Sequence, residues 1–200
     1  SYHFGRRIRP DEFSNALDDA LFDCDWMPYD AFGEARIDGR ELVLHNERYR
    51  VLVVPAAEVI PYETLAKAKA FFDAGGTVVG YGILPSGSAT LGRTSADIAG
   101  LRRAIWGEAP LVGSRACGTN AAGGRSYFLA EEPSSADVRA ALAGDAGIHP
   151  DLEVIDGETH LVRAEGRVRQ RRGRNPVERP AGQRLEVDPP VVRRQRDPVG

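Results

Sequence analysis

The sequence predicts an α/β fold in which helices cover a mainly parallel sheet. Residues 50–55 and 77–81 are continuous apolar runs without polar alternation, which is typical of strands that are buried on both faces. Between them, residues 61–74 repeat apolar side chains at helical spacing and end at a glycine pair, which favours the end of a helix. This strand–helix–strand unit spans about thirty residues, the size of a right-handed βαβ crossover. We therefore expect the two strands to be adjacent, parallel and central.

The elements that precede this unit follow from shorter signals. Residues 10–22 place Phe13 and Leu17 on one helical face, with acidic residues in the first turn, which predicts a helix. Residues 25–29 are expected to be extended or a short strand, and residues 30–35 to be a short helix. The runs 35–37 and 41–44 flank Asp38-Gly39, a strong hairpin signal.

Helices and strands alternate less regularly after residue 81. We expect loops at 82–92 and 116–124, helices at 95–106 and 136–142, and strands at 126–129 and 152–155. Ser134 or Ser135 is expected to cap the helix at 136–142. The strand at 152–155 is predicted to be the last one of the α/β part.

The charge pattern predicts two parts, an α/β domain over residues 1–162 and a truncated β module or disordered tail over 163–200. The second part holds eleven arginines against five acidic residues, and prolines interrupt it. Within it, residues 183–187 and 191–192 alternate weakly and could be edge strands. Because the first residue is Ser1 and not Met, we interpret the sequence as a piece of a longer protein, and it predicts no compartment.

The composition excludes several classes of protein. The chain has 200 residues, of which 42% are hydrophobic and 28% charged, with a formal net charge of -3. It lacks an apolar run of the ~18 residues that cross a bilayer, so we expect no membrane partner. The acidic balance argues against a dedicated nucleic-acid binder. Two cysteines are too few for a disulfide scaffold or a four-cysteine zinc site, and the four histidines show no paired spacing. We therefore predict no metal and no cofactor.

The candidate site residues lie where the predicted strands end, because α/β proteins place ligands at the carboxyl edge of the sheet. Glu58 follows the strand at 50–55 and is the one acid that we single out. Tyr81 and Gly82 form the turn after the strand at 77–81. A nucleophile elbow would carry Ser or Cys at such a turn, and here the only hydroxyl is the Tyr81 phenol. For Glu58, an ordinary loop or capping role is the alternative.

A cysteine-dependent enzyme is a second interpretation. Cys117 lies among small residues in a predicted loop, and a Cys–His pair with His149 or His160 would supply a nucleophile and its base. Neither histidine is close to Cys117 in sequence. The arginines at 167–174 could contact phosphate, but they lack interleaved aromatic residues.

Several segments together resemble a known family. They are the run at 49–55, Val59-Ile60-Pro61, Thr64-Leu65, the run at 71–79, and Leu84-Pro85. Their order and spacing are similar to those of the class I glutamine-amidotransferase-like module of large glycoside hydrolases, which is related to the β-galactosidase trimerisation domain. The closest likeness is to alpha-L-rhamnosidase-type enzymes. Asp25 with Trp26, the hairpin at Asp38-Gly39 and the helix that ends at Trp106 fit the same pattern, so the resemblance covers roughly residues 10–162.

The resemblance implies a flavodoxin-like, three-layer arrangement and a non-catalytic, structural or assembly role in the parent hydrolase. It implies that the catalytic carboxylates belong to a barrel upstream, so no catalytic residue is carried over to this chain. An amidotransferase would hold its cysteine near Gly82, which has no side chain. The partners implied are other domains of the parent hydrolase, a second copy of the chain, and carbohydrate indirectly.

Overall fold

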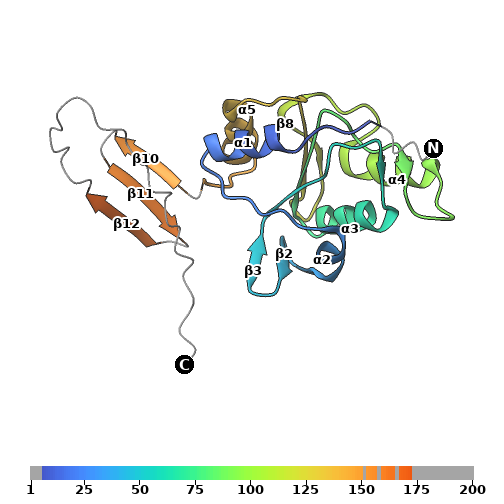
Figure 1. The fold of residues 1–200 in the computed structure, drawn as a ribbon, viewed down its shortest axis with the longest axis horizontal. Coiled ribbons are helices and arrows are strands. Elements are labelled where there is room, and N and C mark those ends of the chain that lie inside the picture. Colours follow the sequence, from blue (N-terminus) through green and yellow to red (C-terminus); the bar gives the residue numbers. More distant parts are fainter. Residues whose placement is uncertain (1–5, 151, 157–158, 165–166, 173–200) are drawn as a thin grey trace, which may run out of the picture.

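The computed structural model describes residues 6–150, 152–156, 159–164 and 167–172 (Figure 1). Its main sheet contains four strands in the order β4-β6-β9-β8. Strands β4, β6 and β9 are parallel to one another, and β8 is antiparallel to β9. The protein is therefore a mixed α/β fold with a mostly parallel sheet, as the sequence predicts. The bounds of the four strands are Val51–Val53 (β4), Thr77–Tyr81 (β6), Gly113–Thr119 (β8) and Arg125–Leu129 (β9).

The predicted pairing of the two apolar runs is confirmed, because Val51 to Val53 pair in parallel with Thr77 to Val79. The expectation that both strands are central is wrong for β4, which lies at the edge of the described sheet. Its three residues are half-buried, whereas all five residues of β6 are buried. Strand β4 is also shorter than predicted, since Pro55 has no N–H to continue a ladder.

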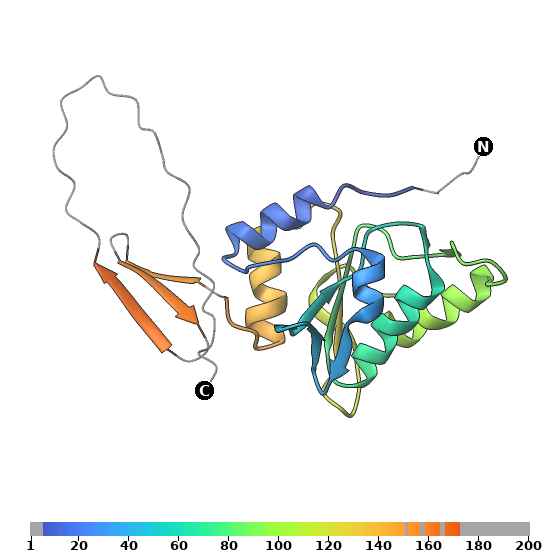
Figure 2. The same ribbon diagram turned by 60° about the horizontal axis from the view of Figure 1, so that its bottom comes forward.

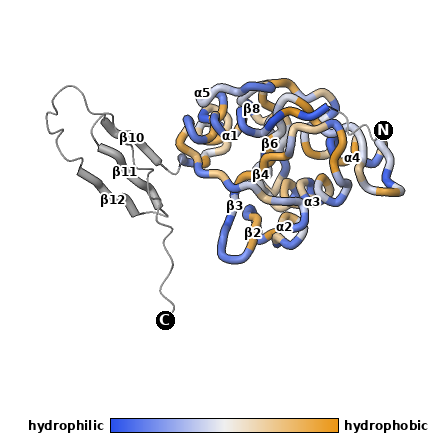
Figure 3. The backbone as a smooth tube through the Cα atoms, viewed as in Figure 1, coloured by the Kyte–Doolittle hydropathy of each residue, from blue (hydrophilic) through white to orange (hydrophobic). Residues whose placement is uncertain are grey.

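Helices pack against both sides of β6. Helices α3 (Tyr62–Asp73) and α4 (Ser95–Trp106) contact each other and share one apolar core, which Val78 joins from the sheet. A second core contains Val79 of the same strand, together with α1, α5 and a π-helical turn, η1. Because neighbouring residues of β6 enter different cores, the strand is apolar without alternation. Figure 2 shows α3 and α4 side by side, and Figure 3 shows β4 coloured hydrophobic. The remaining bounds are Asp11–Asp19 (α1), Ser135–Arg139 (α5) and Ala140–Asp145 (η1).

A small antiparallel sheet, β1-β2-β3, follows a short helix, α2 (Tyr29–Glu34). The predicted hairpin is confirmed, but Asp38 pairs with Glu41, so its two turn residues are Gly39 and Arg40. Gly39 has φ +57°, which a glycine adopts without cost. Strand β3 was not predicted, since its three residues are mostly polar. The bounds are Arg36–Asp38 (β1), Glu41–Leu44 (β2) and Glu47–Tyr49 (β3).

Several predicted elements need correction. The predicted loop at 116–124 contains the end of β8, a strand that the sequence hides because two of its seven residues are glycine. The predicted loop at 82–92 contains a short strand, β7 (Gly87–Ser88), which pairs in parallel with β5 (Val59–Ile60). Residues 25–28 form no strand. The predicted helices at 30–35, 95–106 and 136–142 and the strand at 126–129 are confirmed within a few residues.

The described C-terminal residues form an antiparallel sheet of their own, β10-β11-β12. The strand predicted at 152–155 exists, but it pairs with β11 and not with the main sheet, so its assignment to the α/β sheet is wrong. The predicted domain boundary after residue 162 falls inside β11. The weak strands expected at 183–187 and 191–192 lie outside the described residues. The bounds are Leu152–Asp156 (β10), Thr159–Ala164 (β11) and Arg167–Arg172 (β12).

Candidate functional site

The carboxyl edge of the parallel strands is crossed by the chain's own N-terminal segment, residues 6–8. The Ile8 N–H donates to the Ala56 carbonyl at 2.9 Å, and the Glu58 N–H donates to the Arg6 carbonyl at 2.9 Å. Arg7 and Ala57 form an antiparallel bridge between these two contacts. The segment therefore lies over the loop that follows β4, where an α/β protein places its ligand.

Glu58 is held by backbone groups from two directions. Its carboxylate accepts a hydrogen bond from the Arg6 N–H at 2.8 Å. Its carbonyl accepts from the N–H groups of Ser86 and Gly87, each at 2.8 Å. The residue is half-buried. These contacts join the N-terminal segment, the β4–β5 loop and β7, so the geometry supports the structural role for Glu58 that the sequence left open.

Tyr81 is a core residue whose side chain is 2% exposed. Its ring stacks on Phe13 of α1 with the ring centroids 4.7 Å apart. Burial raises the pKa of the phenol, and the charges of Glu12 and Asp11 act in the same direction, while a backbone hydrogen bond with Ala56 opposes them. The phenol is therefore protonated at neutral pH, which does not suit a nucleophile.

Gly82 occupies a position that strongly favours glycine. Its φ is +58°, and a Cβ atom there would lie 2.3 Å from Ile8 Cδ1 and 3.0 Å from the Glu131 Cα. Glu131 also binds the Arg6 guanidinium at 2.8 Å. The turn after β6 is thus packed against the N-terminal segment on one side and the end of β9 on the other, and it offers no group for catalysis.

Cys117 lies on β8, and its thiol approaches the Ser126 carbonyl at 3.4 Å and the Ser126 hydroxyl at 3.7 Å. Burial raises the pKa of the thiol, against smaller opposing hydrogen bonds. The thiolate, which is the reactive form, is therefore disfavoured. Within residues 6–150 no hydrogen bond joins this thiol to His149. The pairing with His160 concerns a side chain outside the described ones.

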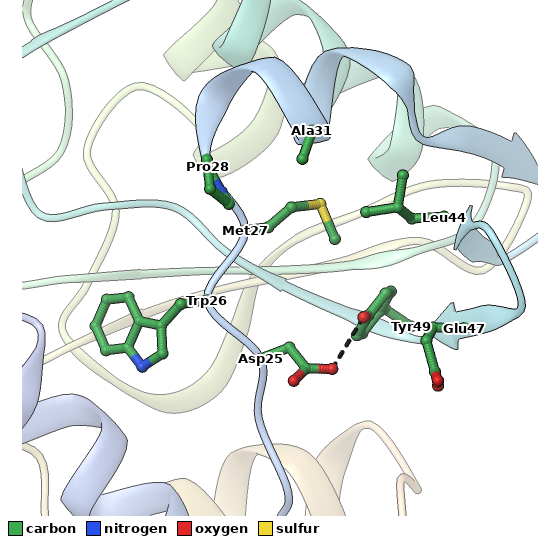
Figure 4. Close-up of a pocket in the computed structure, with 8 residues that line it drawn as sticks. All are labelled: Asp25, Trp26, Met27, Pro28, Ala31, Leu44, Glu47 and Tyr49. Carbon is green, nitrogen blue, oxygen red and sulfur yellow. Dashed lines mark hydrogen bonds between the residues drawn. The ribbon is translucent and has the colours of Figure 1, made fainter.

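A pocket of about 220 Å³ lies between the segment that enters α2 and the β2–β3 hairpin (Figure 4). Figure 4 shows the side chains of Asp25 and Met27 pointing toward Tyr49 and Leu44, while Trp26 points to the other side of its segment, at the rim. The lining residues are Asp25, Trp26, Met27, Pro28, Ala31, Leu44, Glu47 and Tyr49.

The polar groups of this pocket are two carboxylates and a phenol. The Tyr49 hydroxyl donates to the Asp25 carboxylate at 2.9 Å, which fixes the orientation of both side chains. Glu47 is two strand positions before Tyr49, so the two side chains lie on the same face of β3. Trp26 is 63% exposed, which is unusual for the largest apolar side chain.

The surroundings of the pocket are acidic. Burial raises the pKa of the Cys24 thiol, and the charges of Asp18, Asp23 and Asp25 raise it further. These carboxylates thus produce a negative potential on the segment that leads into the pocket.

A second hollow, of about 300 Å³, lies beside α4. The Nε of Arg102 is buried there without a hydrogen-bond partner, while the neighbouring Glu108 is paired with Arg103 at 2.9 Å. The other lining residues are Leu84, Pro110 and Phe128. This hollow thus holds one cationic group and one carboxylate that is already paired.

The sequence reasoning named Asp25 and Trp26 only as part of a family resemblance and missed Glu47 as a pocket residue. The available signal was the pair Glu47 and Tyr49 at alternate positions. In the structure they follow a tight turn at His45, which has a φ of +54°. Such a pattern predicts one face of a strand, but it does not show which segment lies opposite.

In the described part of the chain, no group of three or more His, Cys, Asp or Glu side chains could hold a metal ion. No helix there is long and apolar enough to cross a membrane. No family model, curated protein or solved structure matches this chain.

Proposed function

We propose that this chain is a non-catalytic accessory domain of a carbohydrate-active glycoside hydrolase, similar to the alpha-L-rhamnosidase-type enzymes. The catalytic barrel would lie upstream in the parent chain. The domain would contribute to packing, to assembly or to the rim of the substrate site, with the other domains of the hydrolase or a second copy as its partners. Support comes from the order and spacing of the segments at 49–55, 59–61 and 71–79 that resemble the glutamine-amidotransferase-like module.

The finer fold belongs to the same proposal. A flavodoxin-like, three-layer arrangement agrees with the parallel pairing of β4, β6 and β9. It also agrees with the two cores that β6 joins, one with α3 and α4 and the other with α1 and α5. The antiparallel strand β8 is an edge addition that such sheets tolerate.

The proposal rests mainly on the turn after β6, on which residue stands there and on how closely it is packed. A catalytic relative would need a nucleophile at this turn, next to free space for a substrate. Here Gly82 stands at the turn with φ +58°, and a Cβ atom there would lie 2.3 Å from Ile8 Cδ1 and 3.0 Å from the Glu131 Cα, so a nucleophilic side chain would be strained and crowded. Residues 6–8 lie over the same edge and occupy the backbone groups of Ala56 and Glu58. A structural domain is consistent with both features.

The alternative, a small cysteine-dependent hydrolase or amidotransferase-like enzyme, has weaker support. It would require the Cys117 thiolate, and burial raises the pKa of that thiol. The thiol also lies against the Ser126 carbonyl, an acceptor that favours the protonated form.

The test is an activity assay of the purified 200-residue chain on an aryl α-L-rhamnoside and on glutamine. We expect no turnover of either compound, because the catalytic carboxylate pair of the proposed parent hydrolase would belong to its upstream barrel. Variants Glu58→Gln and Cys117→Ala separate the two catalytic alternatives. Turnover that either variant abolishes would overturn the proposal. Sequencing the gene upstream of Ser1 is the complementary test, and the absence of a barrel-encoding region there would also count against it.

A further inference from the structure

We infer that the hollow beside α4 is a docking site for an acidic segment of a partner protein, in which one carboxylate side chain has apolar neighbours. The hollow has a volume of about 300 Å³ and is lined by Leu84, Arg102, Glu108, Pro110 and Phe128. This docking site goes beyond the proposed function and does not depend on it, because only the charge, burial and exposure of residues on this domain support it.

Arg102 brings to the hollow a positive charge that has no partner among the described residues. Its Nε is buried and makes no hydrogen bond. Buried polar groups in folded proteins are nearly always hydrogen-bonded, so an unpaired guanidinium nitrogen calls for an acceptor. The carboxylate of Glu108, which lines the same hollow, is instead paired with Arg103 at 2.9 Å. We therefore expect the acceptor to come from a bound partner.

The charges around the hollow favour a carboxylate over a phosphate group. A guanidinium binds a carboxylate through two parallel N–H donors, and the two groups carry single, opposite charges. Among the described residues that line the hollow, Arg102 is the one cation. A phosphate carries more negative charge than one arginine balances, and the excess would be repelled by Glu108, whose side chain is 75% exposed.

The rest of the lining is apolar. Leu84, Pro110 and Phe128 are half-buried, so each still has surface that a partner can cover. Covering apolar surface stabilises a complex, and it also excludes water from the ion pair, which strengthens the attraction between its charges. The hollow therefore suits a carboxylate that arrives with apolar side chains beside it.

Two exposed apolar side chains border the hollow and extend it into a surface. Leu111 is 81% exposed and Val112 is 59% exposed. They lie between Pro110, which lines the hollow, and Gly113, which pairs with the lining residue Phe128. Single exposed apolar residues are ordinary, but two in succession beside an unpaired buried cation indicate an interaction surface. A small free anion would leave both side chains uncovered, whereas a protein segment covers them.

The experiment is an NMR titration of the ¹⁵N-labelled 200-residue chain with a blocked tripeptide, acetyl-leucyl-glutamyl-leucine amide. Its matched control is the same peptide with glutamine in place of glutamate, which keeps the shape and removes the charge. The reporter is the Nε–H signal of Arg102, assigned by its absence from the spectrum of Arg102→Met. We expect a saturable shift of this signal with the glutamyl peptide, with a Kd of ~1–10 mM for so small a ligand, and no saturable shift with the glutaminyl peptide.

Variants then assign the contact, with the backbone N–H signals of Leu111 and Val112 as reporters. Arg102→Met keeps an apolar stem and removes the guanidinium, so it should weaken binding by about tenfold or more. Glu108→Gln removes a like charge beside the bound carboxylate and should strengthen binding by about two- to fivefold at low salt. Arg139→Gln changes an exposed arginine outside the hollow and should leave the Kd unchanged. Where Arg102→Met perturbs folding, Glu108→Gln still decides, because Glu108 is exposed.

Four results would overturn the docking site. One is the absence of an Arg102 shift with the glutamyl peptide, and another is an equal response to both peptides. A third is acetate or inorganic phosphate that binds as tightly as the peptide, which would identify a site for small anions that gains nothing from the apolar border. The fourth is binding that Glu108→Gln weakens. None of these results affects the accessory role, which the turnover assay and the upstream gene sequence test separately.

Discussion

Single residues at the carboxyl edge of the main sheet act as structural ties. Glu58 accepts a backbone hydrogen bond from Arg6, and Gly82 fits between Ile8 and Glu131. The sequence predicted that Glu58 and Gly82 lie at this edge, since both follow buried strands. It could not predict that residues 6–8 lie across the edge, because no periodicity in that short polar segment indicates its contact with a loop fifty residues away.

Replacing Gly82 by Ala tests this packing. Gly39 provides a matched control, since its φ of +57° is nearly the same as the +58° of Gly82 but no atom lies within 4 Å of its Cβ position. Both Ala variants should lose about 1 kcal/mol from the left-handed backbone. Gly82→Ala should lose a further ~1–3 kcal/mol, because its Cβ meets the Glu131 backbone.

Urea unfolding of the two variants and the parent chain measures these differences. The expected order of stability is the parent chain, then Gly39→Ala, then Gly82→Ala. Equal losses for the two variants would mean that the turn after β6 has room for a side chain, so that a nucleophile could be accommodated at this edge.

Pocket residues were harder to predict than edge residues. Asp25 and Tyr49 are 24 positions apart and meet only because α2 and the β1–β2 hairpin fold between them. Local sequence patterns contain no information on which hairpin face lies opposite an irregular segment. Trp26 was named only through the family resemblance, and its 63% exposure is a property of the tertiary structure.

At the scale of elements, long periodic segments were predicted well and short ones poorly. Helix α4 begins and ends at the predicted residues, since Thr94 caps it and the apolar residues Ile98 and Ile105 repeat at helical spacing. Strand β8 was missed because Gly113 and Gly118 weaken its pattern, and its pairing with β9 shifts register between them. Two-residue strands such as β5 have too few residues for a period to be recognised.

The difference between a central and an edge strand predicts different outcomes for the same substitution. Val78 on β6 is fully buried, so Val78→Asp should unfold the domain, because a buried unpaired charge costs several kcal/mol. Val53 on β4 is half-buried at the edge, so Val53→Asp should leave a folded chain with a lower Tm. Far-UV circular dichroism during heating distinguishes the two. A cooperative, parent-like melt of Val78→Asp would contradict the placement of β6 between the two cores.

The two capping boxes predict an acid-sensitive contribution to stability. Hydrogen bonds from Thr94, backbone and hydroxyl, lower the pKa of Asp97 at the start of α4. The Ser134 hydroxyl and N–H lower the pKa of Asp137 at the start of α5. Because the folded-state pKa values lie below the unfolded value of about 3.9, this stability is present above that pH and is lost as the pH falls through the folded values.

The double variant Asp97→Asn, Asp137→Asn should therefore be less stable than the parent chain at pH 7 and lose less stability on acidification. Ser134→Ala, which removes one cap, should cost about 1 kcal/mol at pH 7. Asp19→Asn is the control, since Asp19 is exposed at the last position of α1 and outside both boxes. Denaturant midpoints at pH 7 and pH 3 measure the effect. If the double variant has the same denaturant midpoints as the parent chain at both pH values, the capping boxes do not form in solution.

For the molecule as a whole, the two apolar cores of the described side chains span residues Ile8 to Ile148. Strands β10, β11 and β12 pair with one another and share no strand pairing with the main sheet. From the arginines and prolines, the sequence predicted that the α/β domain ends near residue 163. The last strand of the main sheet is β9, which ends earlier, at Leu129. Strand β10 misled the prediction because an apolar run such as 152–155 looks the same whichever sheet it joins.

A chain that stops at residue 150 should fold and melt like the full chain. The physical reason is that β10, β11 and β12 pair with one another and not with the main sheet, so their removal breaks no strand pairing of that sheet. Removing residues 151–200 removes eleven of the arginines, so the shortened chain should differ in net charge and solubility while its Tm stays within a few degrees. Scanning calorimetry of the two chains measures this.

Limited trypsin digestion of the full chain provides the independent measurement. Six arginines lie between Arg163 and Arg174, and four of them are on β12, the edge strand of the β10-β11-β12 sheet. The stretch has only two apolar residues, Ala164 and Val168, so this edge strand should open locally at low cost. The first cuts should therefore fall between Arg163 and Arg174 and leave a product that still melts cooperatively. Early cuts after Arg40 or Arg125, with the 163–174 stretch intact, would contradict this order. A shortened chain without a cooperative melt would show, in addition, that residues beyond 150 stabilise the α/β part directly.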